Sequence, residues 1–159
     1  AYALDGFAFA AEALVGQSLG AKNRHLFRKS VVMTSQWGVG SVILMALAFF
    51  VFGNSIINVM TTAEDVRAVS YVYLPWMVLA PLAGVAAWML DGIFIGATRT
   101  ADMRNMMFIS FCIYLIALAL LLPAYGNHGL WASLIIFSIA RGVTLGFKYP
   151  ALEGSIDLK

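Results

Sequence analysis

MMFISFCIYLIALALLLPAY, residues 106–125, is a run of 20 residues without one charged side chain. At about 1.5 Å per residue, a helix of this length crosses the roughly 30 Å of hydrocarbon in a bilayer. The run lacks the alternation of apolar and polar residues that is typical of a strand, and a helix in lipid satisfies its own backbone hydrogen bonds. The stretch therefore predicts a transmembrane helix.

Four more apolar runs of similar length occupy residues 1–21, 31–53, 70–98 and 129–148. Of the 159 residues, 62% are hydrophobic and 11% are charged, whereas a soluble domain is about half apolar and a quarter charged. The net charge of +2 is too small and too scattered for a nucleic-acid partner. We therefore expect an all-α, polytopic membrane protein with about five transmembrane helices in a lipid bilayer, rather than a soluble protein with unusually apolar helices.

The basic residues predict how these spans are oriented. If five spans alternate in direction, Arg67 lies on one side and Arg141 inside the last span. The other eight basic residues fall together on the opposite side: Lys22, Arg24, Arg28, Lys29, Arg99, Arg104, Lys148 and Lys159. Basic loops stay cytoplasmic, so the first, third and fifth spans should run inward and residues 149–159 should form a cytoplasmic tail.

Two connections carry local signals of helix ends. Thr61 precedes Glu64 by three residues, and Thr62 precedes Asp65 by three, which are capping-box spacings and predict a helix start there. YGNHG, residues 125–129, predicts a tight turn between the last two spans.

Four ionisable residues lie well inside the predicted spans, namely Asp5, Glu12, Asp91 and Arg141. Each would cost a few kcal/mol on a lipid-facing surface, so we expect each to face the bundle interior or water. Their helical neighbours are small: Ala8 and Gly16 share the face of Asp5 and Glu12, and Gly84 and Ala87 share that of Asp91.

Glu12, Asp91 and Arg141 lie at similar depths, counted from the basic end of their spans, so Arg141 can pair with Glu12 or with Asp91. One arginine cannot neutralise three carboxylates, and an acid left over could bind a proton, a cation or a cationic substrate. Asp91 is our leading candidate, with Glu12 and Asp5 also considered. The simpler alternative is that Glu12 and Arg141 form a buried structural pair.

The third run contains Pro75 and Pro81, followed by Gly84. Proline removes a backbone hydrogen bond, and transporters use interrupted helices as hinges beside binding sites. We therefore expect a hinge here. The sequence shows no nucleophile–base pair, phosphate loop or zinc spacing, and His25 and His128 fall in loops on opposite sides. We expect neither an enzyme nor a metal site.

The stretches ALVGQSLGAKN and LDGIFIGATRTADMRNMM resemble the helix ends of the MATE family, the multidrug and toxic compound extrusion transporters. Together with GNHGLWASL and ARG they are similar to its DinF branch, and the resemblance covers nearly the whole chain. Members have twelve helices in two six-helix lobes. The five spans would match the eighth to twelfth helices, so the resemblance implies a C-terminal lobe whose first helix, and whose N-terminal lobe, lie outside this chain.

The resemblance further implies an antiporter of the bacterial inner membrane. Such a protein exports cationic or amphipathic compounds in exchange for protons or sodium, by alternating access and without any cofactor besides the coupling ion. In the DinF branch, coupling of transport to the ion is assigned to an aspartate in the first helix of the N-terminal lobe. Asp91 falls in the matching tenth helix, about one turn from the acid that another branch uses. A lipid or polysaccharide-precursor flippase, a channel and a non-transporting scaffold stay open as alternatives.

Overall fold

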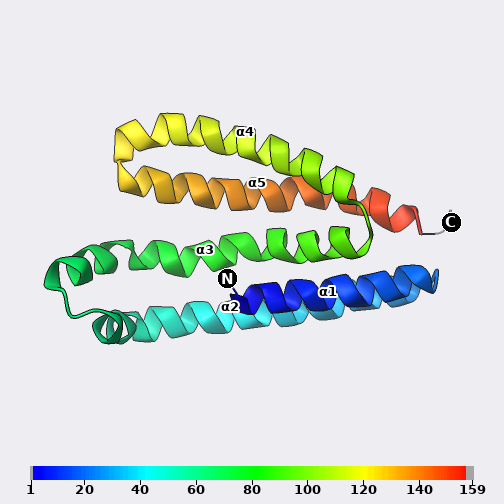
Figure 1. Ribbon diagram of the computed structural model, residues 1–159, viewed down its shortest axis with the longest axis horizontal. Coiled ribbons are helices and arrows are strands. Elements are labelled where there is room, and N and C mark those ends of the chain that lie inside the picture. The colour runs from blue at the N-terminus through cyan, green and yellow to red at the C-terminus, as the bar shows by residue number, and fades with distance from the viewer. Residues whose placement is uncertain (1, 157–159) are drawn as a thin grey trace.

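The structure is a computed structural model that describes residues 2–156, with side-chain surroundings from Asp5 onward. The described chain forms five helices and no strand, which confirms the all-α prediction. They are α1 (Tyr2–Gly20), α2 (Arg24–Met60), α3 (Glu64–Gly96), α4 (Thr100–Tyr125) and α5 (Asn127–Gly154). Figure 1 shows an elongated bundle of antiparallel neighbours, in which α1, α3 and α5 run in one direction and α2 and α4 run back.

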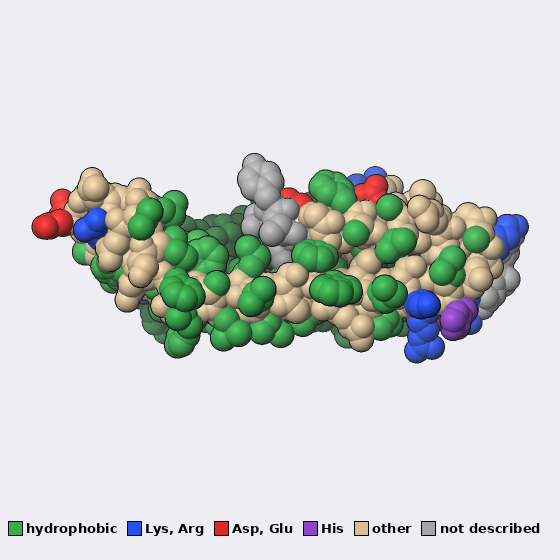
Figure 2. Space-filling view, turned by 90° about the horizontal axis from the view of Figure 1, so that it is seen from below, with side chains coloured by type: hydrophobic (Ala, Val, Ile, Leu, Met, Phe, Trp, Pro, Cys, Tyr) green, Lys and Arg blue, Asp and Glu red, His purple; other side chains and the backbone are tan. Residues whose placement is uncertain are grey.

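Four of the helices, α2 to α5, are long and apolar enough to cross a membrane by length and composition. The first, α1, is a helix as predicted but is not among these four, and Asp5, Glu12 and Gln17 interrupt its 19 residues. Large hydrophobic side chains are exposed along the outside of the bundle, as in Phe50 at 76% and Leu44 at 70%. In Figure 2 such side chains cover the long middle of one face, while most of the visible basic ones gather at one end.

The helices extend beyond the predicted spans at both ends of the bundle, since α2 reaches Met60 and α3 starts at Glu64. Helix α2 already begins at Arg24, and α5 continues to Gly154. Residues 149–154 are therefore helical, and the cytoplasmic location of the tail 149–159 stays a prediction. Leu152 and Ile156 are 3% and 5% exposed and join a hydrophobic core with Phe27, Phe94 and Leu145. This packing explains the longer helix, because apolar contacts with neighbouring helices extend it past the hydrocarbon-length run.

The predicted capping boxes at the start of α3 are wrong. The N-cap residue is Ala63, which has no side chain able to accept a hydrogen bond. The Thr61 hydroxyl instead accepts a hydrogen bond from the Ala63 backbone N–H at 3.3 Å, and Thr61 itself ends α2. Arg67 then donates to the carbonyls of Asn58 and Thr61, which joins the two helix ends through a charged side chain.

Both prolines of the predicted hinge lie inside one continuous helix, since α3 runs unbroken from Glu64 to Gly96. The helix curves over its first turns, at the left of Figure 1. Gly84 is buried, and a Cβ placed on it would lie 2.6 Å from the ring of Trp88. The small residue therefore makes room for this indole one turn farther along α3. A hinge motion at Pro75, Pro81 and Gly84 stays a prediction.

The ends of α1 and α3 form two matching turns. Each has the spacing Gly-x-x-x-Gly-Ala, starting at Gly16 and at Gly92. The residue after each alanine has a positive φ, 50° at Lys22 and 57° at Thr98. In each turn three equivalent backbone hydrogen bonds of 2.8–3.1 Å close the helix end, in the pattern of a Schellman motif. The chain thus enters α2 and α4 through the same geometry.

The turn between α4 and α5 is reduced to Gly126, which confirms the predicted tight connection. Its φ of 55° and ψ of −131° lie in a region that is essentially open to glycine alone. We expect Gly126→Ala to destabilise the protein by about 1–3 kcal/mol. Equilibrium unfolding in mixed detergent micelles measures the effect. Gly146→Ala in α5 is the control, because nothing lies within 4 Å of a Cβ there; equal stability of the two variants would contradict the prediction.

Candidate interior charge site

Helices α1 and α3 contact each other backbone to backbone next to the predicted charged residues. A Cβ on Gly92 would fall on the carbonyl oxygen of Ala8, and one on Gly96 would fall on that of Glu12. Gly16 in turn faces the Gly96 carbonyl, which would lie 3.6 Å from its Cβ. The small-residue face predicted for α1 is therefore a helix–helix contact. On α3, however, this contact uses Gly92 and Gly96, which lie on a neighbouring face of the helix and not on the face predicted from Gly84 and Ala87.

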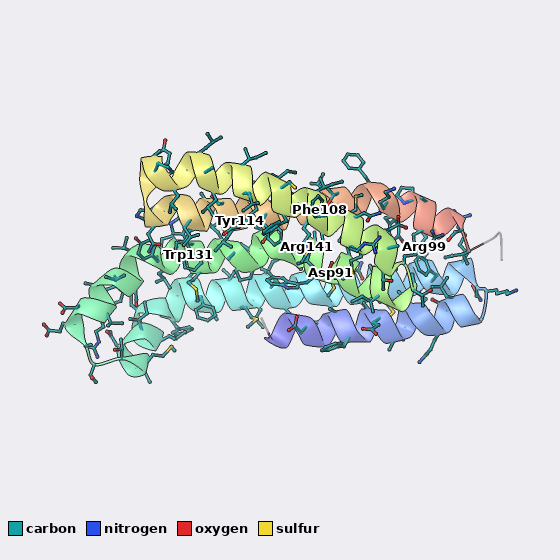
Figure 3. The ribbon with its side chains drawn as sticks, turned by 45° about the horizontal axis from the view of Figure 1, so that its top comes forward. Asp91, Arg99, Phe108, Tyr114, Trp131 and Arg141 are labelled. Carbon is teal, nitrogen blue, oxygen red and sulfur yellow. The ribbon has the colours of Figure 1, made fainter. Side chains whose placement is uncertain are left out.

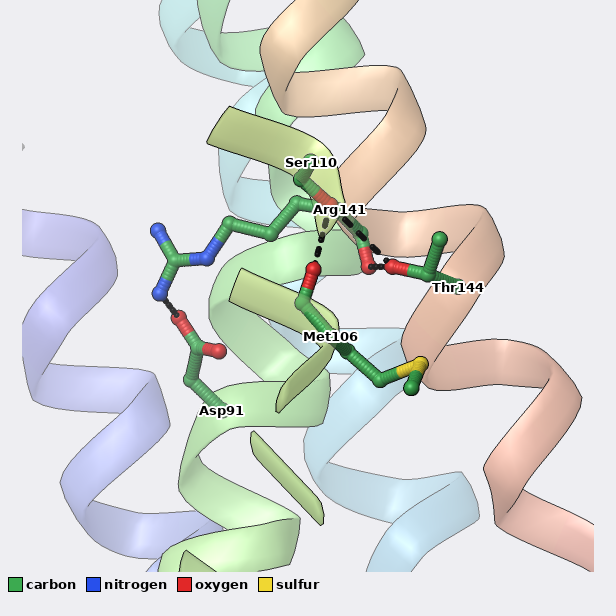
Figure 4. Close-up of polar contacts among 5 residues, drawn as sticks. All are labelled: Asp91, Met106, Ser110, Arg141 and Thr144. Atoms are coloured by element: carbon green, nitrogen blue, oxygen red, sulfur yellow. Dashed lines mark hydrogen bonds and ion pairs between the residues drawn. The ribbon is translucent and has the colours of Figure 1, made fainter. Parts of the chain in front are cut away.

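The close approach of α5 to α3 brings together two of the predicted residues. Gly142 is buried against α3, where its Cβ would lie 3.2 Å from the Cβ of Ala86. The neighbouring Arg141 reaches from α5 and forms an ion pair with Asp91 on α3 (Figures 3 and 4). Their side chains are 18% and 12% exposed, so this pair is largely removed from solvent. Arg141 thus pairs with Asp91, and the alternative pair with Glu12 is not formed.

Contacts from α4 and α5 hold the turn of helix that carries Arg141. The Thr144 hydroxyl donates to the Arg141 carbonyl at 3.2 Å and lies 3.2 Å from the Ser110 hydroxyl on α4 (Figure 4). The guanidinium carbon lies 5.9 Å from the centre of the Phe137 ring, a cation–π distance. The guanidinium is therefore positioned by more than its ion pair.

The ion pair leaves hydrogen-bonding capacity unused. Only Oδ2 of Asp91 accepts from Arg141, while Asp91 Oδ1 and Arg141 Nε are buried and have no partner among the described residues. An unpaired buried acceptor next to a cavity is costly unless water, a proton or a cation satisfies it. The second carboxylate oxygen thus keeps unused capacity to accept a hydrogen bond or to contact a cation.

A cavity of about 270 Å³ adjoins this pair and collects all four predicted intramembrane charges. Asp5 and Glu12 reach it from α1, Asp91 from α3 and Arg141 from α5. Within residues 2–156, the side chains of Asp5 and Glu12 make no hydrogen bond or ion pair. The cavity is therefore lined by three carboxylates and one guanidinium. If all are ionised, its walls carry an excess of two negative charges.

The remaining walls of the cavity are Ala8, which was predicted on the face of Asp5 and Glu12, and five residues that were not predicted from the sequence: Phe9, Trp88, Gly92, Ile95 and Met103. Two of them could have been found from helical spacing, because Phe9 and Trp88 each precede an acid on the same helix by three residues. Met103 comes from α4, and no spacing along the chain connects it to the site. The described part of the chain holds no group of three or more His, Cys, Asp or Glu side chains placed to bind one metal ion.

Comparisons with known proteins agree with this architecture. Residues 2–121 match the family model MatE. The chain is 39% identical over 146 residues to DNA damage-inducible protein F of Escherichia coli strain K12, covering 91% of this chain and 31% of that protein. The fold is similar to the crystal structure of the eukaryotic MATE transporter AtDTX14, with a TM-score of 0.85 at 17% identity, over 98% of this chain and 36% of that one. The chain thus spans about a third of each.

Proposed function

We propose that this chain, which belongs to the MatE family, is part of a secondary active antiporter of the bacterial inner membrane. It would export cationic or amphipathic compounds in exchange for protons or sodium. The observation that carries the proposal is the cavity that holds Asp5, Glu12 and Asp91 with only Arg141 to balance them. Carboxylates inside a membrane protein are costly and commonly mark the path of an ion or substrate.

The local charges support a cation-binding role for Asp91. Arg141 occupies one oxygen of this carboxylate and leaves the other without a partner. A proton, a sodium ion or the cationic group of a substrate can contact that oxygen, and each would also reduce the negative excess in the cavity. Trp88 and Phe9, in the same walls, present aromatic surface to a cation or to an apolar drug.

Transport by alternating access needs a second lobe against which this one rocks. The five helices span about a third of the two proteins compared above. We therefore assign the cycle to a larger polypeptide with an N-terminal lobe and the first helix of this lobe, and expect the 159 residues alone not to transport. Drug export by vesicles that hold only this chain would contradict that assignment.

The direct test is drug efflux by the full-length parent in vesicles, under separate proton and sodium gradients, for the wild type and Asp91→Asn. The amide keeps the size of the side chain and removes its charge, so we expect gradient-driven efflux to fall about ten-fold or more at equal amounts of folded protein. The gradient that drives wild-type efflux identifies the coupling ion.

Asp102→Asn is the matched control, because Asp102 is a partly exposed carboxylate that pairs with Arg99 away from the cavity. It should transport like the wild type. Unchanged efflux in Asp91→Asn would instead make the Asp91–Arg141 pair structural. A flippase for lipid or polysaccharide precursors is the alternative, and it would move a lipid-linked substrate in the same vesicles without drug efflux.

A further inference from the structure

A second cavity, of about 400 Å³, lies between the two matching turns at the ends of α1 and α3. Lys22, in the first turn, and Arg99, which follows Thr98 in the second, both line it. The cavity is therefore bordered by two cationic side chains, one from each turn. In the repeated backbone geometry Lys22 matches Thr98, and Arg99 matches Asn23, the next residue.

The surroundings of this cavity are strongly basic. Seven basic residues lie at this end of the described bundle: Lys22, Arg24, Arg28, Lys29, Arg99, Arg104 and Lys148. Among the residues that the structure describes, two carboxylates lie with them, and each makes a long ion pair, Asp102 with Arg99 at 3.7 Å and Glu153 with Arg24 at 3.4 Å. The positive excess at this end attracts an anion to the cavity mouth.

The start of α4 adds hydrogen-bond donors beside Arg99. In the first turn the Asn23 side chain caps α2 by accepting the Leu26 N–H at 2.9 Å. In the second turn Arg99 is the N-cap residue of α4 and makes no such bond. The first backbone N–H groups of this 26-residue helix are thus left without a side-chain acceptor, and a phosphate oxygen satisfies such groups well.

The remaining lining of the cavity includes apolar side chains beside the polar Thr98 and Ser155. Leu19 and Ala97 come from the end regions of α1 and α3, and Leu152 and Ile156 from the end of α5 and the residues just after it. A small inorganic anion gains nothing from this surface. A phospholipid does, because its glycerol and first acyl carbons follow directly after the phosphate.

We propose that this cavity binds the phosphate of an anionic phospholipid from the cytoplasmic leaflet, held between Lys22 and Arg99 with its glycerol against Leu152 and Ile156. Basic pockets between membrane helices on the cytoplasmic side recognise such headgroups. The lipid would join the turn that connects α1 to α2 with the turn that connects α3 to α4. It would thereby stabilise the contact between α1 and α3 from the end of the bundle opposite the N-terminus of α1.

The test uses the full chain in neutral detergent, with phosphatidylglycerol, phosphatidylcholine or inorganic phosphate added at matched concentrations. Native mass spectrometry counts retained lipid, and thermal unfolding reports stabilisation. We expect phosphatidylglycerol to be retained and to raise the unfolding midpoint, and the other two additives to do neither. Equal protection by inorganic phosphate, or by phosphatidylcholine, would overturn the lipid assignment.

The variants Lys22→Gln and Arg99→Asn should each weaken retention of phosphatidylglycerol about ten-fold, because each removes one charge-assisted contact to the phosphate. Arg99→Asn also gives α4 an asparagine at its N-cap, as Asn23 is at the N-cap of α2. Because asparagine caps a helix well, α4 should stay folded without lipid. Arg104→Gln is the control, since Arg104 lies on α4 at the same end but outside the cavity. Wild-type retention in both cavity variants, or equal loss in the control, would overturn the proposal.

Discussion

Alanine at both Gly92 and Gly96 should separate α1 from α3 and destabilise the protein by about 3 kcal/mol or more. Each new Cβ would fall on a backbone carbonyl of α1, at Ala8 and at Glu12. Backbone atoms cannot rotate away as the end of a side chain can, so relief requires α1 to move as a whole. Because Asp5 and Glu12 reach the cavity from α1, this movement would also open the charge site.

Equilibrium unfolding in mixed detergent micelles measures the loss, with Gly40→Ala and Gly146→Ala combined as the matched control. Both control positions have nothing within 4 Å of a new Cβ. The exchange of these two helical glycines for alanine should leave stability unchanged or raise it by about 1 kcal/mol. If the two double variants were equally stable, the backbone contact between α1 and α3 would not exist.

Breaking the Asp91–Arg141 pair on one side should have the second large effect. Arg141→Met leaves three carboxylates around the cavity without a cation, and Asp91→Leu leaves a buried guanidinium without its partner. We expect each single change to cost about 3–5 kcal/mol of unfolding free energy, because an unpaired charge stays buried. Arg141→Met should cost more, since Asp5 and Glu12 remain to attract the guanidinium in Asp91→Leu.

The double variant Asp91→Leu/Arg141→Met should be clearly more stable than the sum of the two single losses predicts, because it buries no unpaired member of the pair. The same unfolding assay on the four proteins of this cycle gives the coupling energy. Additive losses would mean that the two side chains do not interact in the folded protein.

Much of the fold follows from local signals along the chain. The apolar runs predict all five helices, and the single glycine between α4 and α5 marks the tight turn. The errors fall at helix ends, where packing competes with local preference. The predicted capping boxes at Thr61 and Thr62 do not form, because Arg67 closes the turn instead. The last helix continues past residue 148, the predicted end of its span, because Leu152 is buried.

The four charged residues of the candidate site were predicted from the sequence, but their geometry was predicted only in part. Helical periodicity places Asp5 and Glu12 on one face of α1, and counting from the helix ends places Arg141 level with Asp91. These arguments leave Arg141 with two possible partners, because depth along a helix does not say which neighbours pack closely. The choice of Asp91 depends on Gly142, which lets α5 approach α3.

The sequence by itself determined that this protein is a helical membrane protein with costly charges inside its spans, because hydropathy and helical period are properties of short segments. Only the tertiary structure decided which carboxylate meets Arg141, which glycines form the contact between α1 and α3, and that the turns at Lys22 and Thr98 border one basic cavity. These outcomes depend on the distances between helices. Such distances are set by side chains that are far apart in the chain and meet only when the bundle packs.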